Sequence, residues 1–137
     1  MIKQVVFLKR RPDLTMQEFM DYYENQHSQL SKRMGAKPAL PNAQRYVRRY
    51  VRPEKNPVTL EEHDPGYDCI MEIWWNSRED FENSQRIISD PARLPMTKAD
   101  EERLFASHAN PVCTCIEYDS PMGPNGEATQ VEVKYEN

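Results

Sequence analysis

The 137-residue sequence contains no long apolar run and only four glycines. A transmembrane helix needs about 20 consecutive apolar residues, and no stretch of this sequence comes near that length. Walker, Rossmann, HExxH and GxSxG motifs are absent, and so few glycines argue against a phosphate-binding loop. We therefore expect neither a membrane-spanning protein nor a nucleotide-binding one.

The sequence also has no excess of basic residues. It contains 18 Lys and Arg against 22 Asp and Glu, so the formal net charge is -4. General nucleic-acid binding requires a basic face, which this balance disfavours. The amino-terminal apolar stretch is too short for a signal peptide and has no small-residue cleavage site. These absences predict a cytoplasmic protein with no nucleic-acid partner and no membrane association.

Cysteine is scarce as well. The three cysteines, Cys69, Cys113 and Cys115, are odd in number and lack framework spacing, which favours free thiols in a reducing compartment. The Cys113–Cys115 spacing makes a mutual disulfide geometrically unfavourable. No second CxxC or histidine cluster accompanies that pair, so zinc is not indicated. We expect no metal and no cofactor.

The apolar residues that are present follow two alternating periods. Short β-branched or alternating stretches predict four strands, at residues 2–10, 44–52, 67–75 and 111–118. The 53–66 stretch between the middle two holds three prolines and ends in an HDPG turn, which indicates a long exposed loop.

Capping signals mark the helices. Thr15 and Glu18 form a capping-box pattern at the start of a helix over 15–34, and Gly35 can end it. Two further regions have helical features: 77–89, which Ser77 and Asp80 cap, and a segment that begins at Asp90-Pro91, is broken or kinked at Pro95 and continues as helix over 98–108.

The resulting order is β-α-β-β-α-β, the ferredoxin-like arrangement. This α+β fold has an antiparallel sheet with helices on one face. The predicted strands are apolar on both alternations, with Val5 and Phe7 on one side of the first strand and Val6 and Leu8 on the other. A second copy packed sheet against sheet covers the remaining face, so we expect a homodimer with a dimeric α+β barrel.

We place one domain at residues 1–119 and a carboxy-terminal tail at 120–137. The tail holds two prolines, two glycines and few large apolar residues, so we expect it to be disordered or to pack on a partner. Its 129–136 stretch alternates and can add a strand to an edge.

A histidine occupies a core-facing position on the first predicted helix. Steps of four lead from Phe19 to Tyr23 and His27, and Leu30 and Met34 continue the stripe. A histidine in this position is either a satisfied buried residue or, in a tyrosine-lined apolar space, a general acid/base.

The first helix and its surroundings resemble the EthD-domain family of dimeric α+β barrel proteins. The resemblance covers about residues 2–118 and rests on KRRP-LT--EF--YY---H--L, RYVRRY and E-WW-SREDF. It implies that His27 occupies the position of the family's characteristic polar residue. Members of this kind include fungal polyketide-tailoring decarboxylases. Related barrels act without metal as oxygenases, cyclases and lactone isomerases, and the fold alone does not choose among these reactions.

On the second predicted strand, Tyr46, Arg48 and Tyr50 alternate to one face. One interpretation places Tyr46 and Tyr50 in the pocket and lets Arg48 hold an acidic substrate through two hydrogen bonds. The other interpretation is that the arginines of an edge strand extend their charged ends into water.

The third predicted strand and the loop before it supply further candidates. Asp68 and Trp74 share one strand face. Asp68 can orient a histidine or act as a base, or it is a solvated or interface charge; Trp74 can stack on an aromatic ligand or simply pack. His63 lies in the HDPG turn, where it is an exposed loop residue or part of a pocket mouth.

Together these residues predict a cofactor-independent lyase that acts on a small aromatic or polyketide-like acid, with decarboxylation preferred. His27 transfers the proton, Tyr46 and Tyr23 bind oxygens, and Arg48 seats the carboxylate. The alternatives are a dehydratase or cyclase in which His27 removes a proton, a cofactor-free monooxygenase, and a non-catalytic protein that binds an aromatic ligand. The predicted catalytic set is His27, Tyr46 and Asp68, and the predicted substrate-binding set is Tyr23, Arg48, Tyr50, Trp74 and His63.

Overall fold

The computed structural model describes residues 1–119 and 133–135 and contains the predicted succession of strands and helices. Its elements are β1 (Ile2–Leu8), α1 (Met16–Asn25), the 3-10 turn η1 (His27–Gln29), α2 (Leu30–Arg33), β2 (Ala43–Tyr50), β3 (Cys69–Trp75), α3 (Arg78–Ile88), α4 (Leu94–Glu102) and β4 (Val112–Thr114).

The strands form one antiparallel sheet in the order β2-β3-β1-β4. The predicted α+β, ferredoxin-like fold is therefore confirmed. The register sets Tyr46 of β2 and Gln4 of β1 on either side of Ile73 of β3. Because side chains at paired positions point to the same face, all three lie on one side of the sheet.

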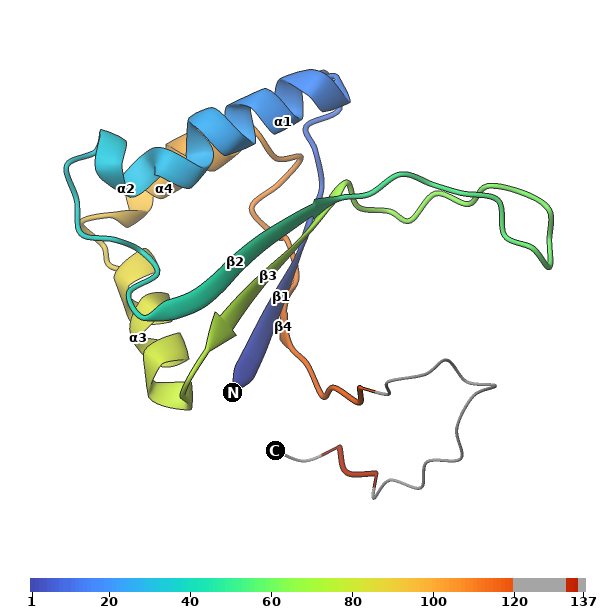
Figure 1. Cartoon of the computed structure of the whole chain (residues 1–137). Helices are drawn as coiled ribbons and strands as arrows, with labels where there is room; N and C mark the ends of the chain where they lie inside the picture. The colour runs from blue at the N-terminus through green and yellow to red at the C-terminus, as the bar shows by residue number, and fades with distance from the viewer. Residues whose placement is uncertain (120–132, 136–137) are drawn as a thin grey trace.

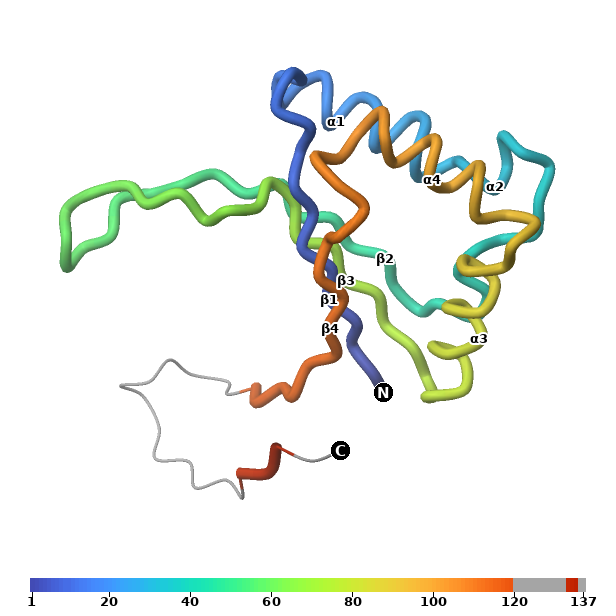
Figure 2. The backbone as a smooth tube through the Cα atoms, turned by 180° about the vertical axis from the view of Figure 1, so that it is seen from behind, coloured from blue at the N-terminus to red at the C-terminus, as the bar shows by residue number. Residues whose placement is uncertain are grey.

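That side is the one that the helices cover (Figure 1), and the view from behind shows the same layering (Figure 2). Phe19 and Tyr23 of α1 pack with Leu8 of β1 and with Phe105, which follows α4. A second cluster packs Phe81 of α3 on Ile73 and Trp75 of β3. The core thus lies between one helical layer and one sheet face.

The first helix is shorter than its apolar stripe predicts. The predicted capping box of Thr15 and Glu18 is present, but α1 ends at Asn25 and η1 and α2 follow. The Ser28 hydroxyl donates to the carbonyl oxygen of Glu24, 2.6 Å away, which is the acceptor that a continuing helix would use. Such back-bonding by serine bends helices. His27 therefore starts a 3-10 turn.

The prediction that Pro95 breaks a helix is wrong. Pro95 lies in the first turn of α4, where a missing backbone N–H leaves no hydrogen bond unmade. The helix runs without interruption to Glu102 and ends before the predicted limit at 108. This placement brings Asp100 into the middle of a helix that faces α1.

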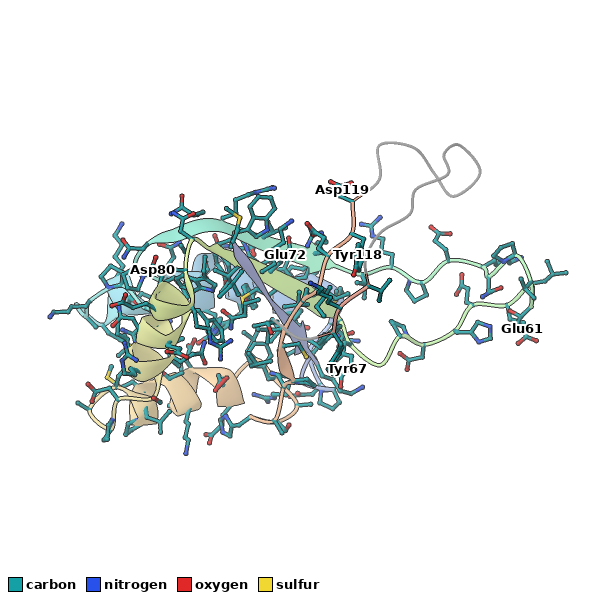
Figure 3. All side chains as sticks on the ribbon, turned by 90° about the horizontal axis from the view of Figure 1, so that it is seen from below. Glu61, Tyr67, Glu72, Asp80, Tyr118 and Asp119 are labelled. Atoms are coloured by element: carbon teal, nitrogen blue, oxygen red, sulfur yellow. The ribbon has the colours of Figure 1, made fainter. Side chains whose placement is uncertain are left out.

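Two segments extend away from this layered body. Residues 51–68 connect β2 to β3 and project beyond the end of the sheet (Figure 1), with Glu61 far out on the segment in the view from below (Figure 3). The predicted tail at 120–137 and its 129–136 strand lie outside the described residues except for 133–135, which carry no strand. Within the part of the chain that is described, no helix is long and apolar enough to cross a membrane.

Candidate active site

A cavity of about 620 Å³ lies between the helical layer and the covered face of the sheet. Gln4, Val6 and Leu8 of β1 line it from below, and His27 and Phe105 line it from the helical side. A volume of this size is within the usual range for small-molecule sites. The sequence prediction that His27 faces a space between helix and sheet agrees with this geometry.

His27 is held by a buried carboxylate. Its Nδ1 lies 2.7 Å from Oδ2 of Asp100, whose side chain is 5% exposed. The Tyr22 hydroxyl donates to Oδ1 of Asp100 at 2.5 Å, and Arg33 Nη1 donates to the same oxygen at 3.4 Å. Burial disfavours the charged carboxylate, but the hydrogen bonds from His27 and Tyr22 outweigh it and lower the pKa of Asp100 to about 2.

The ionised carboxylate determines which imidazole nitrogen carries the proton. Asp100 can only accept, so Nδ1 of His27 is the donor and the neutral ring presents its lone pair at Nε2. No described residue makes a hydrogen bond to Nε2. The rings of Tyr23 and Phe105 pack against the imidazole, with centroids 5.0 and 5.5 Å away. The cavity therefore contains an oriented acid/base with one available nitrogen.

Two tyrosines lie beside this histidine. The hydroxyls of Tyr23 and Tyr46 are 2.7 Å apart, and both residues line the cavity. Burial raises the pKa of Tyr46 to about 12 and raises that of Tyr23 well above its ordinary value. Both hydroxyls consequently stay protonated at neutral pH, and the pair can donate one hydrogen bond to a ligand oxygen.

Arg48 and Tyr50 belong to a separate cluster around Glu24. Arg48 Nε donates to Glu24 Oε2 at 3.0 Å, Arg48 Nη2 also binds Glu24, and the Tyr50 hydroxyl donates to Oε2 at 2.6 Å. Neither Arg48 nor Tyr50 lines the cavity. The carboxylate of this protein's own Glu24 thus occupies the position that sequence reasoning gave to a substrate carboxylate.

The structure does not bring Asp68, Trp74 or His63 to the cavity. Asp68 accepts from the backbone N–H of Arg10 at 2.8 Å, and His63 Nε2 lies 2.7 Å from the Thr59 hydroxyl on the projecting segment. Trp74 faces the open side of the sheet, where its indole donates to Glu72 at 2.9 Å. Figure 3 shows Glu72 on the sheet and away from the projecting segment.

Comparison with known proteins identifies the family. Residues 11–108 match the EthD domain. The chain belongs to the EthD domain family. No curated protein matches the sequence.

Solved structures similar to this EthD domain chain include proteins of plants and bacteria. One from Arabidopsis thaliana has a TM-score of 0.54 at 12% identity and covers 89% of this chain and 100% of its own. An ethyl tert-butyl ether D (EthD) family protein from Bacillus halodurans has a TM-score of 0.53 at 15% identity, covering 86% and 100%. Hydroxynitrile lyase from Passiflora edulis has a TM-score of 0.50 at 17% identity, covering 87% and 94%. At these identities the likeness establishes the fold.

Sequence reasoning missed two residues of this site in the EthD domain chain, Asp100 and Gln4. Asp100 is 73 positions from His27, and the expected break at Pro95 concealed its place within α4. Its signal was a carboxylate four residues before Leu104, a core residue, in a stretch that Pro95 can begin. Gln4 was a polar residue on the helix-facing alternation of β1, between Ile2 and Val6.

Proposed function

We propose that this EthD domain protein is a cofactor-independent lyase that decarboxylates an aromatic or polyketide-like acid. The observation that supports it is the His27–Asp100 pair inside a cavity of small-molecule size. The similar Passiflora edulis structure bears the name hydroxynitrile lyase, so this fold accommodates lyase chemistry. The proposal assigns proton transfer to His27 and orientation of its ring to Asp100.

Decarboxylation requires a proton on the carbon that loses CO2. In the proposed step the bond between that carbon and the carboxylate breaks, and its electron pair passes into the ring or enol system. The protonated His27 then gives its Nε2 proton to the carbon, and the neutral imidazole is recharged from water. Asp100 stabilises the imidazolium because it is ionised and bonded to Nδ1.

The cavity walls favour loss of the charged group. Val6, Leu8 and Phe105 line the space, and an isolated carboxylate is poorly solvated among apolar side chains. Neutral CO2 is not penalised in this way, so burial raises the energy of the substrate relative to the product. The Tyr23–Tyr46 pair supplies a hydrogen bond to the oxygen that gains charge during the reaction.

Dehydration or cyclisation is the second candidate. It is favoured by the tautomer that Asp100 imposes, since a neutral His27 with its lone pair at Nε2 is a general base. In this case the imidazole removes a proton from the carbon next to a carbonyl, and the Tyr23–Tyr46 pair binds the resulting enolate oxygen.

An assay in D2O with 2-hydroxy-1-naphthoic acid tests the proposal. Decarboxylation releases CO2 and leaves 2-naphthol with deuterium on the carbon that carried the carboxylate. We expect both signals from the wild type and from His63→Gln, which alters an exposed histidine outside the cavity, and neither from His27→Gln. Equal CO2 release by His27→Gln and the wild type would refute the proposed role. A library of hydroxylated ketones that loses water but never CO2 would identify a dehydratase instead.

A further inference from the structure

A buried glutamine occupies the sheet side of the cavity and has no role in the proton transfer described above. Gln4 lies on β1, is 4% exposed and lines the cavity. The indole Nε1 of Trp75 donates to its Oε1 at 3.0 Å. Indole nitrogen is only a donor, so this contact fixes the amide orientation with the oxygen towards Trp75. The amide nitrogen consequently points away from the indole.

That nitrogen carries two N–H groups without an assigned acceptor. No hydrogen bond from Gln4 Nε2 is found among the described residues. Buried donors without partners are rare in native proteins because each forgoes a hydrogen bond that it would make in water. A polar side chain on the apolar, helix-facing side of a central strand is therefore explained only in part by Trp75.

Other residues around the same cavity have unpartnered polar atoms. Four buried side-chain N or O atoms lack a hydrogen-bond partner in the described part of the chain, and three belong to cavity-lining residues. Arg93 Nε and Asn110 Nδ2 are donors, and Thr97 Oγ1 can donate or accept. The unmatched groups are thus mainly donors, which a ligand with oxygen acceptors would complement.

We propose that Gln4 is a substrate-binding residue whose amide N–H donates to a carbonyl or enolate oxygen of the ligand. This inference rests on the proposed function for the identity of the cavity as a substrate site. Tyr46 lies across Ile73 from Gln4, so the backbones of the two donors are about 10 Å apart at the usual strand spacing. Donors at two places across the sheet fit a substrate with oxygens on different rings.

Binding of 1-tetralone and tetralin by equilibrium dialysis tests this role without any turnover. The two probes share a fused-ring skeleton, and only the ketone carries an acceptor. We expect the wild type to bind 1-tetralone about tenfold more tightly than tetralin, because the hydrocarbon leaves the buried donor unpaired. Gln4→Met should reduce this ratio to near one while tetralin affinity stays unchanged.

Matched variants separate substrate binding from packing. Gln44→Met, on the exposed part of β2, should keep the wild-type ratio. Because Gln4→Met also leaves the Trp75 indole unpaired, Trp75→Phe is compared with Trp75→Phe/Gln4→Met: the single variant should keep the ketone preference and the double variant should lose it. A wild-type ratio near one, or a preference that survives Gln4→Met or the double variant, would overturn the proposal.

The outcome is distinguishable from failure of the proposed reaction. His27→Gln should retain the ketone preference, since Gln4 does not depend on proton transfer. A protein that decarboxylates no acid but prefers 1-tetralone would contradict the proposed function and leave the role of Gln4 standing. A protein with the proposed activity and no ketone preference would do the reverse.

Discussion

Replacement of Asp100 by asparagine should destabilise the protein in a pH-dependent manner. The substitution keeps the side-chain shape but removes the charge and turns one acceptor oxygen into a donor. Asp100 accepts from His27, Tyr22 and Arg33, so at least one of these partners loses its acceptor. The change also removes the carboxylate that would stabilise a protonated His27.

The magnitude follows from the pKa of the Asp100 carboxyl. Lowering it from the ordinary 3.8 to about 2 corresponds to about 2.5 kcal/mol of stabilisation of the folded state. Because the folded pKa is depressed, this stabilisation is present above the unfolded pKa and is lost as the pH falls through the folded pKa. About half of it should be gone at pH 3.

Urea denaturation from pH 5 to pH 3 measures this effect. The difference in unfolding free energy between the wild type and Asp100→Asn should decrease by about 1 kcal/mol across that interval. Asp21→Asn, on the exposed side of α1, is the control and should show little change. A constant difference over the whole interval, or an Asp100→Asn protein as stable as the wild type at pH 5, would refute the assigned ion pair.

Two further predictions concern the second arginine cluster and the open sheet face. Arg48→Met should cost about 1 kcal/mol of stability by urea denaturation, since the ion pair with Glu24 is partly exposed, and should leave KM for the acid substrate unchanged; a large rise in KM would restore Arg48 as the carboxylate seat. Sedimentation at micromolar concentration should give about twice the 16.2 kDa chain mass, because Trp74 and the rest of the open sheet face lack a helical cover; a monomer at all concentrations would contradict the barrel arrangement.

Local patterns were sufficient to predict much of the fold. The strand alternation placed Cys69, Ile73 and Trp75 on the buried side of β3, and the capping box gave the start of α1. Both features depend on neighbours within a few residues. The end of α1 was missed because a side-chain hydrogen bond of Ser28 competes with the helix, which periodicity does not register.

Contacts between distant elements were harder to predict. The placement of His27, Tyr23 and Tyr46 around one cavity followed from helix and strand faces. The partner carboxylate was predicted at Asp68 but lies at Asp100, because the fold packs α4 beside α1 whereas Asp68 pairs with Arg10. In the same way, Arg48 was assigned to a ligand because strand alternation cannot show that Glu24 of α1 faces it.

The central claim is that His27 transfers the proton in a cavity-bound substrate, and His27→Gln tests it most directly. Glutamine keeps a hydrogen-bonding side chain of similar size but does not titrate near neutral pH. On the acid that the wild type decarboxylates, we expect turnover to fall by about 100- to 10,000-fold with little change in melting temperature, whereas His63→Gln remains active. Nearly full turnover by His27→Gln, or a loss of activity that only follows a loss of stability, would contradict the account.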